Sequence, residues 1–168
     1  MTNVWPLQSG TRHFYGDPDP DRDGVANRSW EDHNLVLITP PYRMVLAWDI
    51  TAPVRKIRVH RKCEDSLLAI LNNIADHFGS EQEIESNRLH LYGGCYNFRL
   101  MRGGTSLSMH SFGCAIDLDP SHNKLGKAYS EKDGMMPMAV VKIFEREGWV
   151  WGGRWHRPDC QHFQAAVP

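Results

Sequence analysis

The stretch that decides the fold is SMHSFGCAIDL, residues 108–118. Small and apolar side chains alternate over 114–118 and predict a short β-strand that carries Asp117. Gly113 and the small residues after it let backbone and side chains crowd around one point. The stretch therefore predicts a strand that brings polar groups together in the middle of the chain.

Apolar periodicity predicts two main helices and several short strands around this stretch. One helix is expected from Glu64 to Gly79, with acidic residues in its first turn, and a second after Pro137, with Gly148 past its end. Short apolar or β-branched runs predict strands at 35–38, 44–47, 57–60, 88–92 and 149–151. The first two of these runs are expected to form a hairpin.

The first 34 residues are rich in Pro, Gly and Asp and are expected to form a loop-rich segment that wraps the domain. The chain has no internal repeat, no low-complexity tract and no second compositional regime. One α+β domain over residues 1–168, with a short antiparallel sheet and two main helices, is the predicted fold class.

Composition excludes several classes of partner. The 168 residues include 19 basic and 20 acidic side chains, and a formal net charge of −1 supplies no field to steer nucleic acid or an anionic membrane. No window approaches a membrane-spanning length of about 18 apolar residues, and the N-terminus does not resemble a signal peptide. Neither a nucleic-acid partner nor membrane insertion is expected. Four scattered cysteines predict small buried side chains in a reducing compartment.

Two separated strings carry metal-ligand residues. His110 and Asp117 lie in the first, and DCQHF, residues 159–163, contains His162. Two imidazoles and one carboxylate would leave a fourth tetrahedral position on Zn²⁺ open for water, as in catalytic zinc sites. Asp159, beside the last ligand, could take a proton from that water. The pattern predicts a hydrolase with one zinc ion per chain.

The two strings, in this order, resemble the zinc D-Ala-D-Ala carboxypeptidase and L-alanyl-D-glutamate endopeptidase family, which cleaves peptidoglycan stem peptides. WGGRWHRPDCQHFQ, residues 151–164, most resembles the bacteriophage endolysin branch, which tends to carry Asp before the last histidine. The resemblance covers roughly residues 57–164. It implies a catalytic core over 57–164, a fold of the Hedgehog/D,D-peptidase kind and a zinc site at the edge of the sheet.

The resemblance also implies a role for each matching residue. His110, Asp117 and His162 would be the zinc ligands, and Asp159 would be the general base. Ser108 matches the family's serine and is expected to orient a ligand or the substrate, unless it is a turn serine that bonds its own backbone.

A cationic group that stabilises the oxyanion is harder to place. Family members usually have an arginine in a Ser-Gly-Tyr-Arg turn, and the nearest equivalent is GCYNFR, residues 94–99, which departs from that turn. Arg99 is the predicted oxyanion stabiliser. Arg102 is its competitor, and solvated surface charges are the alternative for both. Trp151 and Trp155 are expected either to wall the pocket or to pack in the core.

A calcium site is a weaker hypothesis. Residues 19–24, DPDRDG, match the opening of a Ca²⁺ loop, but the twelfth position is Trp30 instead of Glu. A solvated acidic loop is therefore the favoured interpretation.

The sequence as a whole predicts a zinc metallopeptidase that hydrolyses peptidoglycan stem peptides, most simply at the L-Ala to D-Glu bond, in endolysin-type cell-wall lysis. The alternatives are a D-alanyl-D-alanine carboxypeptidase and a catalytically inactive zinc-binding module that serves a virion structurally or in wall binding. The expected protein is a monomer of phage or prophage origin. It would be synthesised in the cytoplasm without a signal peptide and would act on the cell wall after release.

Overall fold

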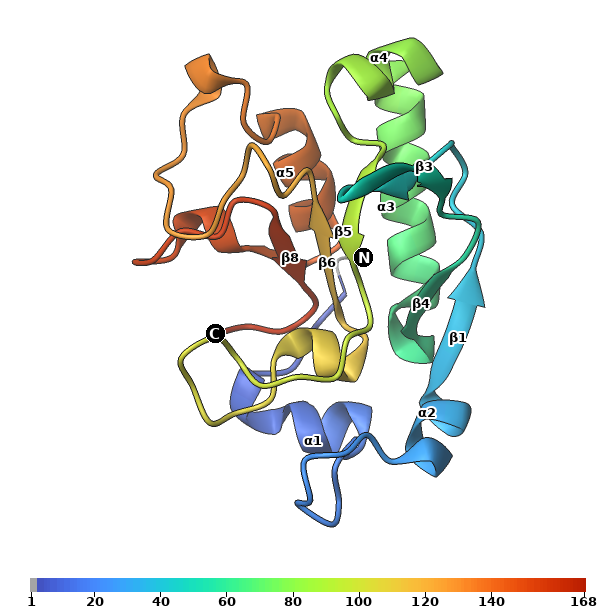
Figure 1. Cartoon of the computed structure of the whole chain (residues 1–168), viewed down its shortest axis with the longest axis vertical. Coiled ribbons are helices and arrows are strands. Elements are labelled where there is room, and N and C mark those ends of the chain that lie inside the picture. Colours follow the sequence, from blue (N-terminus) through green and yellow to red (C-terminus); the bar gives the residue numbers. More distant parts are fainter. Residues whose placement is uncertain (1–2) are drawn as a thin grey trace.

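A six-stranded sheet in the order β3-β2-β5-β6-β8-β7 forms the centre of the fold in a computed structural model that describes residues 3–168 (Figure 1). Neighbouring strands run antiparallel, except that β2 and β5 are parallel. The strands are β2 (Val45–Leu46), β3 (Asp49–Pro53), β5 (Leu91–Gly94), β6 (Ala115–Leu118), β7 (Val150–Trp151) and β8 (His162–Gln164). The predicted α+β fold class is confirmed, with a sheet that is larger than expected and contains one parallel pair.

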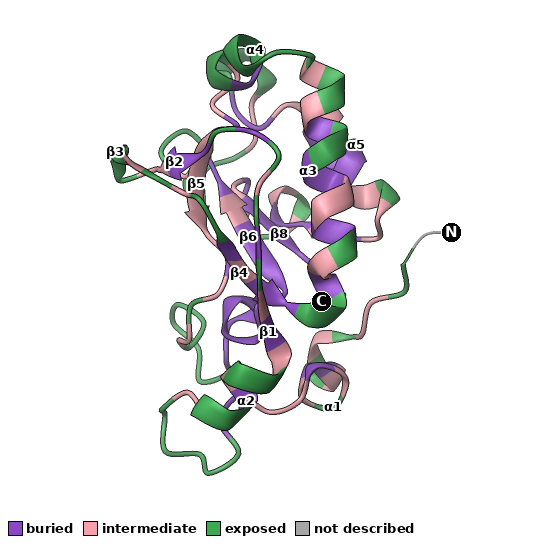
Figure 2. Ribbon diagram, turned by 90° about the vertical axis from the view of Figure 1, so that its right-hand side faces the viewer, coloured by how far each residue is buried: buried purple, intermediate pink, exposed green. Residues whose placement is uncertain are grey.

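Residues 3–168 form five α-helices: α1 (Thr11–Tyr15), α2 (Arg28–Asn34), α3 (Glu64–Phe78), α4 (Glu81–Ser86) and α5 (Met138–Arg146). The two predicted main helices are confirmed as α3 and α5. Gly79 ends α3 in the left-handed region, at φ 71°, where a side chain would be strained. Helices α3 and α5 place their buried sides toward β6 and β8, whereas α4 and β3 are mostly exposed (Figure 2).

The predicted hairpin between 35–38 and 44–47 is wrong. β1 (Leu35–Ile38) pairs antiparallel with β4 (Ile57–His60) in a separate two-stranded sheet, while β2 lies between β3 and β5. Both runs do form strands, but the face that each strand buries decides its partner, and proximity in sequence does not. Ile57 and Val59 are fully buried, so β4 offers β1 an apolar face to pack beside.

The strand predicted at 88–92 begins later, at Leu91. Arg88 has φ 59°, and its guanidinium Nε donates to the buried Asp119 carboxylate at 2.9 Å, so the chain turns there before the strand starts. The strand then continues through Gly93. A Cβ on Gly93 would lie 2.9 Å from Asp117 Cβ, which explains a glycine at this place in the sheet.

The N-terminal segment contains more helix than the sequence predicted, because α1, α2 and the 3₁₀ helix η1 (Gln8–Gly10) lie within it. It contacts the end of the chain: the Tyr15 hydroxyl donates to the Ala165 carbonyl at 2.6 Å, and Gln8 N donates to the Val167 carbonyl at 2.8 Å. These bonds hold the segment beside the residues that follow β8.

The cysteines and the length of the helices complete the description of the fold. All four cysteines are buried and free of disulfides, as predicted. Among the helices of residues 3–168, none has the length and apolar character needed to cross a membrane.

Candidate metal centre

Three ligand-type side chains meet on one face of the central sheet. Asp117 on β6 and His162 on β8 are direct cross-strand neighbours. Alternation along β8 turns Phe163 to the opposite face, where its ring stacks on Phe144 of α5 with ring centroids 3.8 Å apart. The packing of Phe163 in the core therefore fixes the face to which His162 points.

His110 reaches the same point from a short 3₁₀ helix, η3 (Met109–Phe112). Gly113 ends this helix at φ 66°, and a Cβ there would lie 2.8 Å from the His60 backbone nitrogen. Only glycine fits this turn, which directs the chain from His110 into β6. The Ser108 hydroxyl caps η3 by accepting from His110 N–H at 3.3 Å. Ser108 thus bonds the local backbone, as in the second interpretation of this residue, while it also lines the pocket.

The mutual distances suit a small tetrahedral ion. Asp117 Oδ1 lies 2.9 Å from His162 Nδ1 and 3.3 Å from His110 Nε2, and the two ring nitrogens are 3.1 Å apart. Ligands at about 2.0–2.1 Å from tetrahedral zinc are separated by about 3.3 Å. Within residues 3–168, this is the sole group of at least three His, Cys, Asp or Glu residues that could hold a metal, and the acidic loop at 19–24 is not among such groups.

Each histidine is held by a hydrogen bond from its other ring nitrogen. His110 Nδ1 lies 2.7 Å from the Cys95 carbonyl, and His162 Nε2 lies 3.1 Å from Gln164 Oε1. Because both partners are acceptors, each ring can donate outward and offer its other nitrogen, unprotonated, to a metal ion at the centre. Gln164 Nε2 donates in turn to the Ala166 carbonyl at 2.7 Å, which fixes the orientation of the amide.

Gln164 is a candidate functional residue to which the sequence motifs assigned no role. It is almost fully buried and belongs to the same strand as His162. The spacing of two residues on one strand, which places both side chains on one face, is the signal that could have found it.

The two acids of the site differ in their surroundings. Burial alone would raise the pKa of Asp117, but His110 and His162 hold that pKa well below its usual range, so Asp117 is a carboxylate. Burial raises the pKa of Asp159, and the neighbouring Asp117 adds to the shift, against the effect of His162. Asp159 Oδ1 accepts from Gln161 Nε2 at 3.1 Å. A carboxyl group with a raised pKa beside a metal site is suited to exchange protons.

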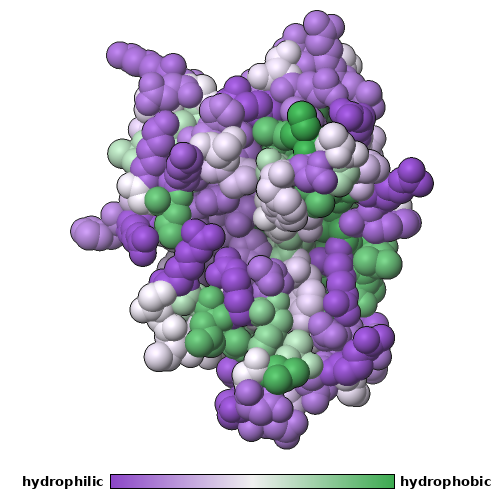
Figure 3. Space-filling view, in the orientation of Figure 1, coloured by the Kyte–Doolittle hydropathy of each residue, from purple (hydrophilic) through white to green (hydrophobic). Residues whose placement is uncertain are grey.

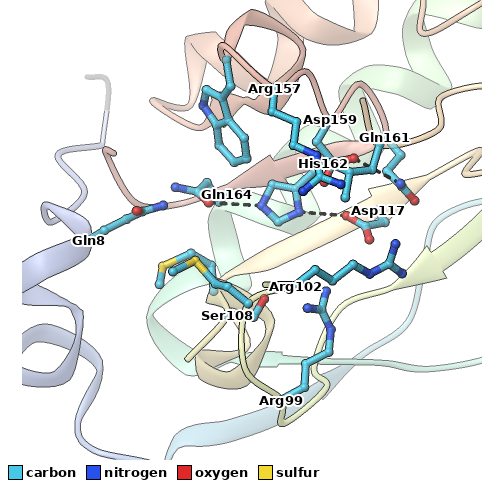
Figure 4. A pocket seen from close by; sticks show the side chains of 14 residues that line it. Gln8, Arg99, Arg102, Ser108, Asp117, Arg157, Asp159, Gln161, His162 and Gln164 are labelled. Carbon is cyan, nitrogen blue, oxygen red and sulfur yellow. Dashed lines mark hydrogen bonds and ion pairs between the residues drawn. The ribbon is translucent and has the colours of Figure 1, made fainter. Parts of the chain in front are cut away.

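These side chains border a cavity of about 210 Å³ (Figure 4). Trp155 lies at its wall, with its ring centroid 5.4 Å from that of His162, whereas Trp151 is buried and donates from Nε1 to the Cys160 carbonyl. Of the two alternatives for the tryptophans, Trp155 thus lines the pocket and Trp151 packs in the core. The cavity is lined by Gln8, Arg99, Met101, Arg102, Ser108, Met109, Asp117, Leu125, Trp155, Arg157, Asp159, Gln161, His162 and Gln164.

Arg99 and Arg102 both line this cavity and extend toward the side where Asp117 lies (Figure 4). In the described part of the chain, neither has an ion-pair partner. The backbone of Arg99 is held at both ends by Ser111, whose hydroxyl accepts from Arg99 N–H at 2.9 Å and donates to the Arg99 carbonyl at 2.7 Å. Arg102 is exposed in the loop that follows. A third cation, Arg157, lines the cavity from the opposite rim and was not selected from the sequence.

The place of the site in the sheet differs from the expectation. The ligands on β6 and β8 lie on two adjacent interior strands, with β7 and β5 outside them, and not at the sheet edge. Ligands on adjacent interior strands are held by hydrogen bonds on both sides, which suits a site that needs fixed geometry.

The second half of the chain carries a family signature. Residues 102–165 match the D-alanyl-D-alanine carboxypeptidase family. The resemblance to the zinc D,D-peptidases is thereby confirmed, and the match supports a peptidoglycan-type peptidase in general. It includes His110, Asp117, Asp159 and His162 and begins after Arg99. Searches of curated proteins and of solved structures gave no match.

Proposed function

We propose that this protein is a zinc metallopeptidase that hydrolyses the L-Ala to D-Glu bond of peptidoglycan stem peptides. The observation that carries the proposal is a three-ligand centre with the half-buried Asp159 in the same cavity. The family match supports the coarser class of peptidase.

His110, Asp117 and His162 would hold the zinc ion, which supplies Lewis acidity at the scissile carbonyl and lowers the pKa of water. Asp159 accepts a proton from the attacking water and returns it to the leaving amine. Arg99 stabilises the negative charge that develops on the carbonyl oxygen. Its pinned backbone is the reason to prefer it over Arg102.

The choice of bond rests on the resemblance of residues 151–164 to the endolysin branch. That resemblance also supports a role in phage-type lysis of the cell wall. Removal of terminal D-Ala is the second candidate, favoured by the match to the D-alanyl-D-alanine carboxypeptidase family. An inactive zinc-binding module is the third candidate, and the presence of Asp159 beside the three ligands argues against it.

Purified protein incubated with cell-wall sacculi, with and without a chelator, tests these candidates. New D-Glu amino termini that depend on metal support the endopeptidase, and free D-Ala supports the carboxypeptidase. Metal binding without either product would leave the binding module. Asp159→Ala should keep zinc bound but release neither product. Asp65→Ala is its matched control, because Asp65 is exposed on α3, and it should digest sacculi like the unaltered protein.

A further inference from the structure

A second hollow lies next to the cavity at the metal centre. This hollow has a volume of about 360 Å³ and shares Gln8, Met101 and Met109 with the first. The two hollows are therefore adjacent and are together named the cleft; residues of the N-terminal segment and of the loop 99–108 line both. The second hollow is lined by Gln8, Ser9, Thr11, Arg12, Met101, Thr105, Ser106, Leu107, Met109 and Phe112.

The two ends of this cleft differ in charge. The metal end has the guanidinium groups of Arg99, Arg102 and Arg157. The second hollow is lined by one charged side chain, Arg12, and this forms an ion pair with Asp17. The cleft is thus cationic near the metal centre and close to neutral in the second hollow.

Side chains at the second hollow combine hydroxyl and amide groups with apolar surface. Ser9, Thr105 and Ser106 are exposed hydroxyls, and Phe112 supplies buried apolar surface beside them. The face of the molecule drawn in Figure 3 is mostly hydrophilic and carries separate hydrophobic patches. A neutral ligand with hydroxyl and amide groups on a partly apolar frame, such as an N-acetylated sugar, has complementary chemistry.

Gln8 stands where the two hollows meet. Its amide lies on the Gln164 side of His162, whereas Arg99 and Arg102 extend on the Asp117 side (Figure 4). The Gln8 backbone is fixed by its bond to the Val167 carbonyl, and within residues 3–168 its side-chain amide makes no hydrogen bond. An amide with free donors and acceptor at this junction can align a substrate that crosses from one hollow to the other.

We infer that the second hollow binds the N-acetylmuramyl sugar at the amino end of the stem peptide, with Gln8 as a positioning residue. In that substrate the sugar is neutral and amide-linked to L-Ala, while the free carboxylates lie on the carboxyl side of the L-Ala to D-Glu bond. The neutral end of the substrate thus meets the nearly neutral second hollow, and its carboxylates meet the cationic end of the cleft near the metal centre. The inference rests on the proposed function, because the sugar is one residue from this bond but four residues from the terminal D-Ala bond.

Two synthetic peptides test the subsite. Both carry L-Ala-D-Glu and the remaining stem residues, and they differ in an N-acetylmuramyl or a plain acetyl group at the amino end. The ratio of their kcat/KM values is expected to favour the muramyl peptide by about 10-fold or more. Gln8→Ala should lower this ratio about 3- to 10-fold, the value of one or two neutral hydrogen bonds. Ser9→Trp, which places a large ring in the hollow, should lower it further.

Leu7→Trp is the matched control, because Leu7 is exposed on the same segment but lines neither hollow, and it should keep the ratio. Calorimetry with the muramyl-L-Ala product gives a second readout, in which Gln8→Ala should bind about 3- to 10-fold more weakly. Equal cleavage of the two peptides by the unaltered protein, with a ratio that Gln8→Ala and Ser9→Trp do not change, would overturn the subsite alone. No cleavage of either peptide at this bond would overturn the proposed function and the subsite with it.

Discussion

Replacing Gln164 with leucine is the most direct test of how the metal centre is held. Leucine has a similar size but no acceptor for the proton of His162 Nε2, which now lies 3.1 Å from Gln164 Oε1. His162 is 6% exposed, so water has little access to replace the lost bond. A buried donor without a partner costs about 1–3 kcal/mol of stability.

The same change should weaken metal binding. Without an acceptor at Nε2, the ring proton can move to Nδ1, the nitrogen that faces Asp117 and His110. Loss of such an outer partner typically lowers metal affinity about 10- to 100-fold. This corresponds to about 1.4–2.8 kcal/mol of binding free energy.

Zinc affinity measured by competition with a chromogenic chelator, together with urea unfolding of the metal-free protein, separates the two effects. Gln161→Leu is the control, because Gln161 lines the same cavity but bonds to Asp159, so zinc affinity should stay unchanged. Zinc binding by Gln164→Leu as tight as that of the unaltered protein would refute the view that Gln164 sets the proton position on His162.

Three further predictions concern the base, the arginines and acid stability. Asp159→Asn should keep zinc bound, as measured by the chelator competition. If Asp159 is the general base, the variant should lower kcat by about 10²- to 10⁴-fold. A near-normal rate would remove Asp159 from that role. Arg99→Ala should lower kcat by about 10²-fold or more, with a smaller effect of Arg102→Ala, and the reverse order in steady-state kinetics would transfer the role to Arg102. Burial lowers the pKa of His60, whose Nε2 lies 2.9 Å from the Tyr15 carbonyl, to about 4. Since the unfolded chain takes up this proton below a pKa of about 6.5, the stabilisation is complete above that pH and is lost as the pH falls toward 4. The free energy of unfolding of the metal-free protein should therefore fall by about 2 kcal/mol through His60 between pH 7.5 and pH 5. In urea unfolding, His60→Gln should show a correspondingly smaller fall. Equal falls in the two proteins would contradict the assignment.

Features encoded within a single segment were predictable. The apolar spacing from Glu64 onward and the glycine at 79 determine α3, because a helix closes its hydrogen bonds within a few residues. The same holds for α5 after Pro137. Strand pairing was not predictable in this way: β1 and β4 are about 20 residues apart and meet through the apolar faces that they bury.

The residues of the candidate site were likewise predictable only in part. Residue types and order pointed to the three candidate ligands, which the structure brings together, and to Asp159, because metal and proton chemistry restricts which side chains can serve. The surrounding residues were not evident: Gln164 acts through a bond to His162, and Arg157 reaches the cavity from the opposite rim.

The sequence by itself determined which side chains could form the centre, since two imidazoles and a carboxylate in a family pattern indicate metal-ligand chemistry without reference to shape. Only the tertiary structure decided where the centre lies, on interior strands instead of a sheet edge, and which parts of the chain complete its cleft. Gln8 is about 150 residues from His162 in sequence and nevertheless borders the same cavity. The reason is physical: the hydrogen bonds that fix the N-terminal segment beside Val167 join residues about 160 apart in sequence, so no local pattern encodes them.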